Sequence, residues 1–165
     1  QRFSTEGKRN IEKAQNRGCE IREHWDAATH CKIYHEAYGT LQQKHVKANY
    51  APAVAFAEKA FSLGKLIPLQ VVQKGTEEVL SSAWILKEKN QLFYWMAAPT
   101  ALGRQCRSTY FLIHHLTQAF AGQCTHLQLL GSDIDAVAHF YRHFGGVNMP
   151  YFATKYHWLQ PFGVK

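Results

Sequence analysis

The chain has 165 residues, and its 46% hydrophobic content can bury one substantial core but not two complete domains. A formal net charge of +7 favours phosphate-bearing partners, whether a cofactor, a nucleotide, tRNA or a membrane surface, without choosing among them. The four cysteines form no C-x-x-C pair and have no regular spacing, which argues against a zinc site or a disulfide framework. The sequence contains no apolar run of about 18 residues, so it predicts no membrane span.

The polar beginning of the chain lacks the apolar core of a signal peptide. Reduced thiols are the simplest interpretation of its cysteines, so we expect a cytoplasmic protein. Because the sequence starts at Gln1, a domain of a longer protein is also compatible with it.

Helices and one short strand are predicted for the first third of the chain. Ser4 to Arg17 forms a basic helix that Ser4 or Thr5 caps, and its basic surface is either a solvated face or a phosphate contact. Cys19 to Arg22 is a first strand. The segment from Ala27 to Leu63 has a helical pattern that breaks near Gly39 and again around residues 49–52. The buried side of its last helix comprises Val54, Ala57, Ala60 and Phe61.

Three strands follow, over Leu66 to Gln73, Val79 to Lys87 and Gln91 to Met96. Short polar loops join them, as antiparallel hairpins require, so they form a meander. Pro68 in the first strand indicates an edge position, a bulge or a later start of that strand.

After Met96 we expect a glycine-containing loop and then the N-terminus of a helix, an arrangement that binds anions through free backbone N–H groups. The residues in this position are Gly103, Arg104, Gln105, Cys106, Arg107 and Ser108. The buried stripe of the following helix comprises Leu112, Ile113, Leu116, Ala119 and Phe120.

The stretch from Leu127 to Gly146 predicts a buried strand (Leu127, Leu129, Leu130), a turn, a helix and a glycine stop. Ser132 is its expected N-cap, with Asp133 and Asp135 in the first turn. The helical spacing turns Ile134, Val137, Ala138, Tyr141 and Phe144 inward. From Pro150 to Trp158 the side chains alternate between two faces with the two-residue period of a strand, which predicts a last strand. Together these elements form an α/β sandwich.

Two motifs resemble a known family. Ala138 to Gly146, A-H-F-Y-R-H-F-G-G, resembles the A-x-x-F-Y-x-x-x-G-F signature of the GNAT acyltransferases, with Val147 in place of the closing Phe. Ser4 to Ala14, S-T-E-G-K-R-N-I-E-K-A, is similar to the S-x-x-x-R-R-N-I-x-K-A opening of the FemAB-like GNAT domain. The resemblance implies one GNAT-like domain over residues 1–165, with a mixed, largely antiparallel sheet flanked by helices. It also implies a preceding GNAT-like half.

The resemblance also implies roles for individual residues. Tyr141 would be a general acid, although a core tyrosine with one hydrogen bond explains it equally well. The oxyanion donor would be a backbone N–H near Trp95, Met96 or Ala97. Acetyl-CoA or another acyl-CoA would place its pyrophosphate at Gly103 to Ser108, where the second glycine of the family motif is missing.

The family's D-F-E-G-S strand reads L-Q-L-L-G-S here, so both of its acidic positions are lost. His126 and Asp133 bracket this strand and are the substitute candidates for a general base.

The acceptor would be a small-molecule or peptide amine, and aminoacyl-tRNA is the alternative donor. We expect no DNA partner and no metal cofactor, although His139 and His143 have the spacing of two ligands on one helical face. Basic residues interleave with aromatics near Arg104 and Lys155, a mixture that nucleic-acid-binding surfaces use. These aromatics also have the helix or strand spacing of residues that pack in a core, and we prefer core packing. The alternative function is a catalytically silent GNAT-like module that binds a ligand or pairs with a sister domain.

Overall fold

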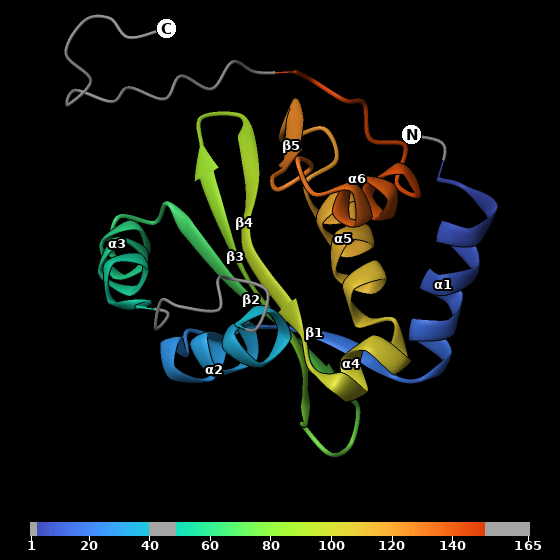
Figure 1. The fold of residues 1–165 in the computed structure, drawn as a ribbon, viewed down its shortest axis with the longest axis horizontal. Coiled ribbons are helices and arrows are strands. Elements are labelled where there is room, and N and C mark those ends of the chain that lie inside the picture. Colours follow the sequence, from blue (N-terminus) through green and yellow to red (C-terminus); the bar gives the residue numbers. More distant parts are fainter. Residues whose placement is uncertain (1–2, 40–48, 151–165) are drawn as a thin grey trace, which may run out of the picture.

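The computed structural model describes residues 3–39 and 49–150. A five-stranded sheet forms its centre (Figure 1). The strands lie side by side in chain order: β1 (Cys19–Glu23), β2 (Leu66–Gln73), β3 (Val79–Glu88), β4 (Gln91–Pro99) and β5 (His126–Leu129). The first four are antiparallel, and β5 runs parallel to β4. This confirms the α/β sandwich with its mixed, largely antiparallel sheet.

Helices cover both faces of the sheet (Figure 1). One face carries α1 (Thr5–Asn16), α5 (Ser108–Ala119) and α6 (Asp135–Arg142), and the other carries α2 (Ala27–Tyr38) and α3 (Ala51–Ser62). The short helix α4 (Ala101–Cys106) connects β4 to α5. None of the described helices is both long and apolar enough to cross a membrane.

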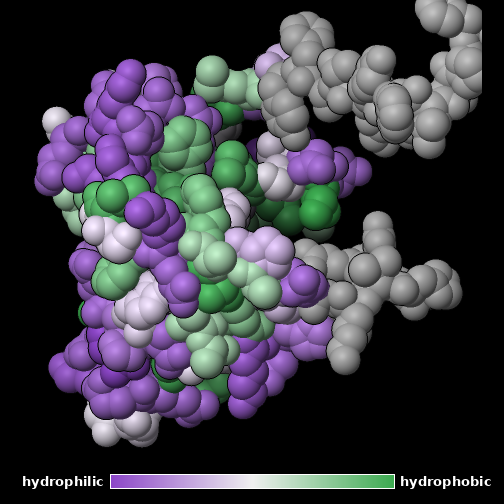
Figure 2. Space-filling model, turned by 90° about the vertical axis from the view of Figure 1, so that its left-hand side faces the viewer, coloured by the Kyte–Doolittle hydropathy of each residue, from purple (hydrophilic) through white to green (hydrophobic). Residues whose placement is uncertain are grey.

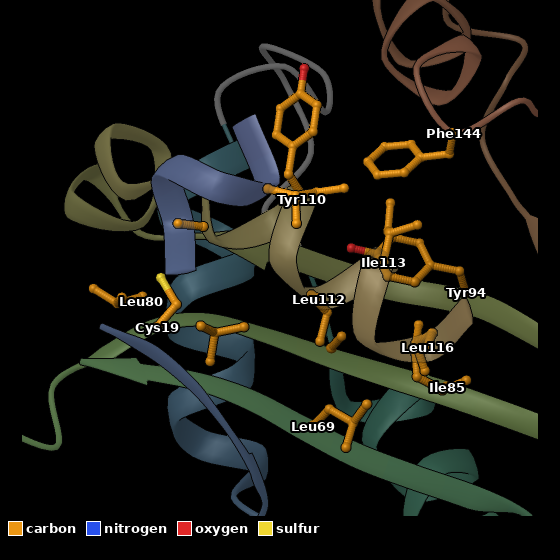
Figure 3. Packing of buried hydrophobic residues seen from close by; sticks show 14 of the residues in the cluster. Cys19, Leu69, Leu80, Ile85, Tyr94, Tyr110, Leu112, Ile113, Leu116 and Phe144 are labelled. Carbon is orange, nitrogen blue, oxygen red and sulfur yellow. The ribbon is translucent and has the colours of Figure 1, made fainter. Parts of the chain in front are cut away.

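Each face of the sheet has its own buried cluster. The larger one lies between the sheet and α5, where Leu112, Ile113 and Leu116 are at most 1% exposed (Figure 3). On the other face Trp84 is the largest buried side chain, and the ring of His30 stacks on it with centroids 3.9 Å apart. The sheet is therefore buried on both sides, and ligand access has to come from an edge or a gap.

The two motifs at opposite ends of the chain meet in space (Figure 1). Of the two predicted caps, Ser4 is the one that caps α1, and it accepts from Gly7 N at 3.0 Å. Its backbone N donates to His143 O at 2.9 Å, and its hydroxyl lies 3.0 Å from His143 Nδ1. Hydrogen bonds thus join the start of α1 to the end of α6.

Pro68 occupies an internal strand that begins at Leu66, so the expectations of an edge position and of a later start are both wrong. The register shift of this strand lies between Val71 and Val72 and not at Pro68. β1 pairs with β2 only as far as Glu23 opposite Leu69, so Pro68 lies one residue beyond the end of β1. On the side that faces β1, the Pro68 carbonyl accepts from His24 N. Because β1 has already ended there, the N–H that a proline lacks is not needed for a hydrogen bond of the sheet.

One residue predicted as buried is exposed in each of α5 and α3. Ala119 is exposed because it lies in the last turn of α5. Phe61 is 40% exposed and stacks on Trp25 at 5.0 Å, at the margin of the cluster that Ala57 and Ala60 fill. A band of hydrophobic residues on this side of the molecule is visible in Figure 2.

Helix α6 starts later than predicted. Ile134 is its N-cap residue, with φ −94° and ψ 115°, and no side chain caps the helix. Ser132 is therefore not the cap, and Asp133 lies before the first turn. Ile134 is 58% exposed and does not point inward, whereas Tyr141 and Phe144 are buried as predicted.

Strand β5 is less buried than predicted. Leu127 and Leu129 are half-buried, and Leu130 is 43% exposed. Among the strands that the structure describes, β5 has a neighbour on one side only, which is β4, and it ends at Leu129. The strand expected over Pro150 to Trp158 falls outside the described residues, apart from Pro150 itself.

The glycine-containing segment after β4 is helical, so the expectation of a loop there is wrong. Thr100 caps α4 by accepting from Gly103 N at 3.0 Å, and Thr100 N donates to Leu80 O at 2.9 Å. Arg107, in the left-handed region at φ 62°, separates α4 from α5. Gly103 packs so closely on β3 that a Cβ would overlap the carbonyl oxygen of Leu80.

We predict that Gly103→Ala lowers the free energy of unfolding by about 2 kcal/mol in urea denaturation. Alanine favours a helix by about 1 kcal/mol over glycine, but the overlap is with backbone and no side-chain rotation relieves it. Gln105→Ala, at an exposed position of the same helix, is the control and should change stability by less than about 0.5 kcal/mol. An unchanged or raised stability of Gly103→Ala would contradict the close packing.

Candidate functional site

The two strands at the open edge of the sheet separate partway along their length. β5 pairs with β4 from Gln91 opposite His126 to Tyr94 opposite Leu129. β4 then continues to Pro99 without a β5 partner. On this side, the backbone of β4 beyond Tyr94 has no strand partner among the described residues, so its N–H and C=O groups can meet a ligand.

A bulge lies at the same point. Trp84 of β3 is opposite Met96, but its neighbour Ile85 is opposite Tyr94, so Trp95 is an extra residue in β4. A bulge disrupts the ladder locally and changes the direction of side chains. Tyr94 accordingly packs in the cluster beneath α5, whereas Trp95 and Met96 both pack with the cluster of Trp84.

A cavity of about 590 Å³ occupies the space between the separated strands. Its lining comes from α2, from β4, from α4 and the start of α5, and from the β5–α6 segment. Tyr34 and Tyr38 of α2 lie on one wall, and Phe140 and Tyr141 of α6 lie on another. Helices α2 and α6 cover opposite faces of the sheet (Figure 1). Because both line the cavity, it reaches both sides of the sheet.

Three of the six residues of the expected phosphate-binding segment line this cavity: Gly103, Arg104 and Arg107. The Arg104 guanidinium donates to Ala37 O at 3.3 Å, at the last turn of α2. The guanidinium of Arg107 makes no hydrogen bond or ion pair with any described residue, although Arg107 lies at the N-cap of α5. Of the two arginines that line the cavity in the described part of the chain, Arg107 is thus the one whose guanidinium remains available to an anionic ligand.

The other three residues do not line the cavity. Cys106 and Ser108 are buried, and Ser108 Oγ lies 3.0 Å from Gly103 O. Gln105 is exposed, and its carbonyl accepts from Arg17 at 3.0 Å. Ser108 thus joins α5 to α4, and Gln105 joins α4 to the end of α1.

Trp95 and Ala97 line the cavity, whereas Met96 does not. The Met96 side chain is 8% exposed and belongs to the cluster around Trp84. The bulge places two successive side chains, Trp95 and Met96, on the α2 side of β4, and of these two only Trp95 lines the cavity.

Tyr141 lines the cavity and is only 9% exposed. Its hydroxyl donates to Leu130 O at 3.0 Å, on the segment where β5 turns away from β4. Burial, with a further contribution from the nearby Tyr38 and Tyr34 phenols, raises the pKa of Tyr141 well above that of an ordinary tyrosine. The phenol is therefore protonated at neutral pH and can only donate a proton.

Tyr94 is a second cavity tyrosine, which the sequence analysis missed. It is 5% exposed, and its hydroxyl has no hydrogen-bond partner among the described residues. Burial, and then the Tyr141 and Tyr38 phenols, raise the pKa of Tyr94 well above the ordinary value. A buried hydroxyl without a partner costs free energy, and a ligand in the cavity can supply that partner.

The two candidate bases are not brought to Tyr141. His126 is exposed at the start of β5, where its ring lies 2.9 Å from Thr125 Oγ1, and it lines a separate cavity of about 680 Å³ beside α1 and α5. Asp133 is exposed in the turn before α6 and lines neither cavity.

The histidine pair of α6 is adjacent, with His139 and His143 ring centroids 5.3 Å apart. His143 already contacts Ser4, and the described residues contain no group of three metal-ligating side chains.

A signal for the missed aromatic wall was present in the sequence. Tyr34 and Tyr38 are four residues apart in a predicted helix and so had to share a face. What could not be read was that this face turns toward β4, because the α2–β4 contact joins residues about 60 positions apart.

Sequence comparison matches the chain to no family model and to no characterised protein. Solved structures share its fold, at low identity. Glucosamine-6-phosphate N-acetyltransferase from Arabidopsis thaliana has 17% identity and a TM-score of 0.51, with 84% of this chain and 97% of that one covered.

A possible acetyltransferase from Clostridium difficile 630 has 15% identity and a TM-score of 0.65, with 86% of this chain and 99% of that one covered. An aminoglycoside acetyltransferase from an uncultured soil metagenomic sample has 11% identity and a TM-score of 0.60, with 85% and 98% covered. The chain therefore has the fold of the GNAT acetyltransferases.

We predict opposite effects on stability for two Tyr→Phe substitutions in the cavity. Tyr94→Phe removes a buried hydroxyl without a partner, so the free energy of unfolding should stay the same or rise by up to about 1 kcal/mol. Tyr141→Phe removes the donor to Leu130 O and should cost about 1 kcal/mol or more. Urea denaturation of both variants and the parent checks this. A loss of more than about 1 kcal/mol in Tyr94→Phe would mean that its hydroxyl has a partner in the free protein.

Proposed function

We propose that the protein is an N-acyltransferase that moves an acyl group from a coenzyme A thioester to an amine. The observation that carries this proposal is the cavity between β4 and β5, which brings Tyr141, the unpartnered Tyr94 hydroxyl and the free Arg107 guanidinium to one space. The GNAT fold supports it, since the three solved structures described above are named as acetyltransferases.

The residues present fit an acyl-CoA in part. Arg107 and the first N–H groups of α5 supply positive charge for phosphates. Gly103 does not supply a backbone cradle, because the place of its missing Cβ is filled by Leu80 O. Phosphate binding in this proposal therefore depends on Arg107 and on the α5 N-terminus.

The thioester supplies an activated acyl carbon, and the chain supplies position, hydrogen-bond donors and a proton. A backbone N–H of Trp95 or Ala97 beyond the β4–β5 pairing would meet the developing oxyanion. The amine nitrogen forms the new C–N bond as the C–S bond breaks. Tyr141 Oη gives a proton to the departing sulfur, and the proton that the amine loses restores the phenol.

The FemAB-like resemblance makes aminoacyl-tRNA the alternative donor. Its aminoacyl ester is chemically similar to a thioester and would be attacked in the same way. A silent module that binds a ligand without turnover is the alternative from another functional class. Direct binding of coenzyme A separates the first proposal from the aminoacyl-tRNA donor, and turnover of acetyl-CoA with an amine separates it from the silent module.

We predict that titration calorimetry shows micromolar binding of acetyl-CoA and of free coenzyme A. Arg107→Ala should weaken both about tenfold, equivalent to about 1.4 kcal/mol, since a charge-assisted contact to phosphate is lost. Lys59→Ala removes the same charge from the exposed side of α3 and should leave the affinity unchanged. Absence of binding to the folded parent protein would refute the coenzyme A proposal and leave aminoacyl-tRNA or a silent module.

A further inference from the structure

The charge around the cavity is of one sign. All twelve acidic side chains of the sequence lie in the described residues, and none of them lines the cavity. The charged residues of its lining are Arg104 and Arg107. A cationic ligand would meet like charges there without a compensating carboxylate, whereas a neutral or anionic ligand would not.

The wall formed by α2 and the bulged part of β4 is aromatic. Tyr34 and Tyr38 contact each other with ring centroids 5.1 Å apart, and Trp95 lies across from α2 on β4. Tyr94 adds its unpartnered hydroxyl to the same space. Such a surface favours a flat, apolar ring with few polar substituents, because aromatic faces and edges pack on one another.

The chemistry of the amine points the same way. A protonated amine has no lone pair and must lose a proton before it attacks a carbonyl. No histidine of the described residues lines the cavity, and burial raises the pKa of Tyr38, Tyr94 and Tyr141, which keeps these phenols from acting as bases at neutral pH. An aromatic amine avoids this requirement, since its lone pair is delocalised into the ring and it is already neutral at pH 7.

We propose that the acceptor is an aromatic amine without positive charge, held by Tyr34, Tyr38 and Trp95. This inference rests on the proposed acyl transfer and names its acceptor class. In the balanced step, the amine and the acyl thioester give an N-aryl amide and the free thiol. One proton passes in net from the nitrogen to the sulfur, and no oxidant or reductant is needed.

The test begins with the parent protein saturated with free coenzyme A, so that no turnover occurs. Calorimetry then compares 4-aminobenzoate with spermidine, an aliphatic polyamine. We expect 4-aminobenzoate to bind at least about tenfold more tightly. Tighter binding of spermidine, or binding of neither compound, overturns the inference. The proposed function survives that result, because coenzyme A binding is measured first on the same protein.

Variants locate the acceptor. Tyr38→Ala should weaken 4-aminobenzoate about tenfold and leave coenzyme A binding within about twofold. Phe61→Ala is the matched control, since it also removes a partly exposed ring from the α2–α3 side but lies outside the cavity. Equal effects of the two substitutions on 4-aminobenzoate would overturn the assignment of this wall.

The pH profile gives an independent result. With acetyl-CoA and 4-aminobenzoate, kcat/KM should be nearly flat between about pH 6.5 and 8.5, because the amine is neutral throughout. Among residues 3–39 and 49–150, the titratable groups that line the cavity are five tyrosines and two arginines. Burial raises the pKa of Tyr38, Tyr94, Tyr110 and Tyr141. A rise of about tenfold per pH unit would show that a group on the protein must lose a proton before the neutral amine reacts, contrary to the inference that no base is needed.

Discussion

The separation of β4 from β5 after Tyr94 and Leu129 is the constraint on which the site depends. A sheet buried on both faces has no room for a ligand unless two neighbouring strands separate. The bulge at Trp95 lies directly after the last pair and turns the following part of β4. The hydrogen bond from Tyr141 to Leu130 O holds the other side of the gap open, so one tyrosine both shapes the cavity and faces it.

A single carbonyl group organises the opposite end of this gap. Leu80 O accepts from Thr100 N and lies 3.2 Å from Thr100 Oγ1. Gly103 packs so close to the same oxygen that no side chain fits at its position. This contact fixes α4, and the left-handed Arg107 then directs the α5 N-terminus to the cavity. A glycine that looked like part of a phosphate loop is therefore a packing residue, and the neighbouring arginine becomes the candidate for phosphate contact.

Much of the fold could be predicted from local patterns, and the site only in part. The bounds of β2, the Ser4 cap and the inward Tyr141 depend on nearby residues alone and were predicted correctly. The start of α6 was not, because Ser132 is a good cap by residue type but the chain turns into the helix only at Ile134. The Trp95 bulge and the unpartnered Tyr94 hydroxyl arise from pairing between distant segments, which periodicity does not report.

The most direct test of the central claim is an NMR titration of the ¹⁵N-labelled protein with acetyl-CoA. If the donor enters between the separated strands, the backbone amide signals of Trp95, Ala97 and Thr109 should shift, whereas those of Thr125 and His126 at the other cavity should not. Shifts confined to Thr125, His126 and their neighbours would place the ligand beside α1 and α5 and contradict the account. So would a folded protein whose spectrum does not change.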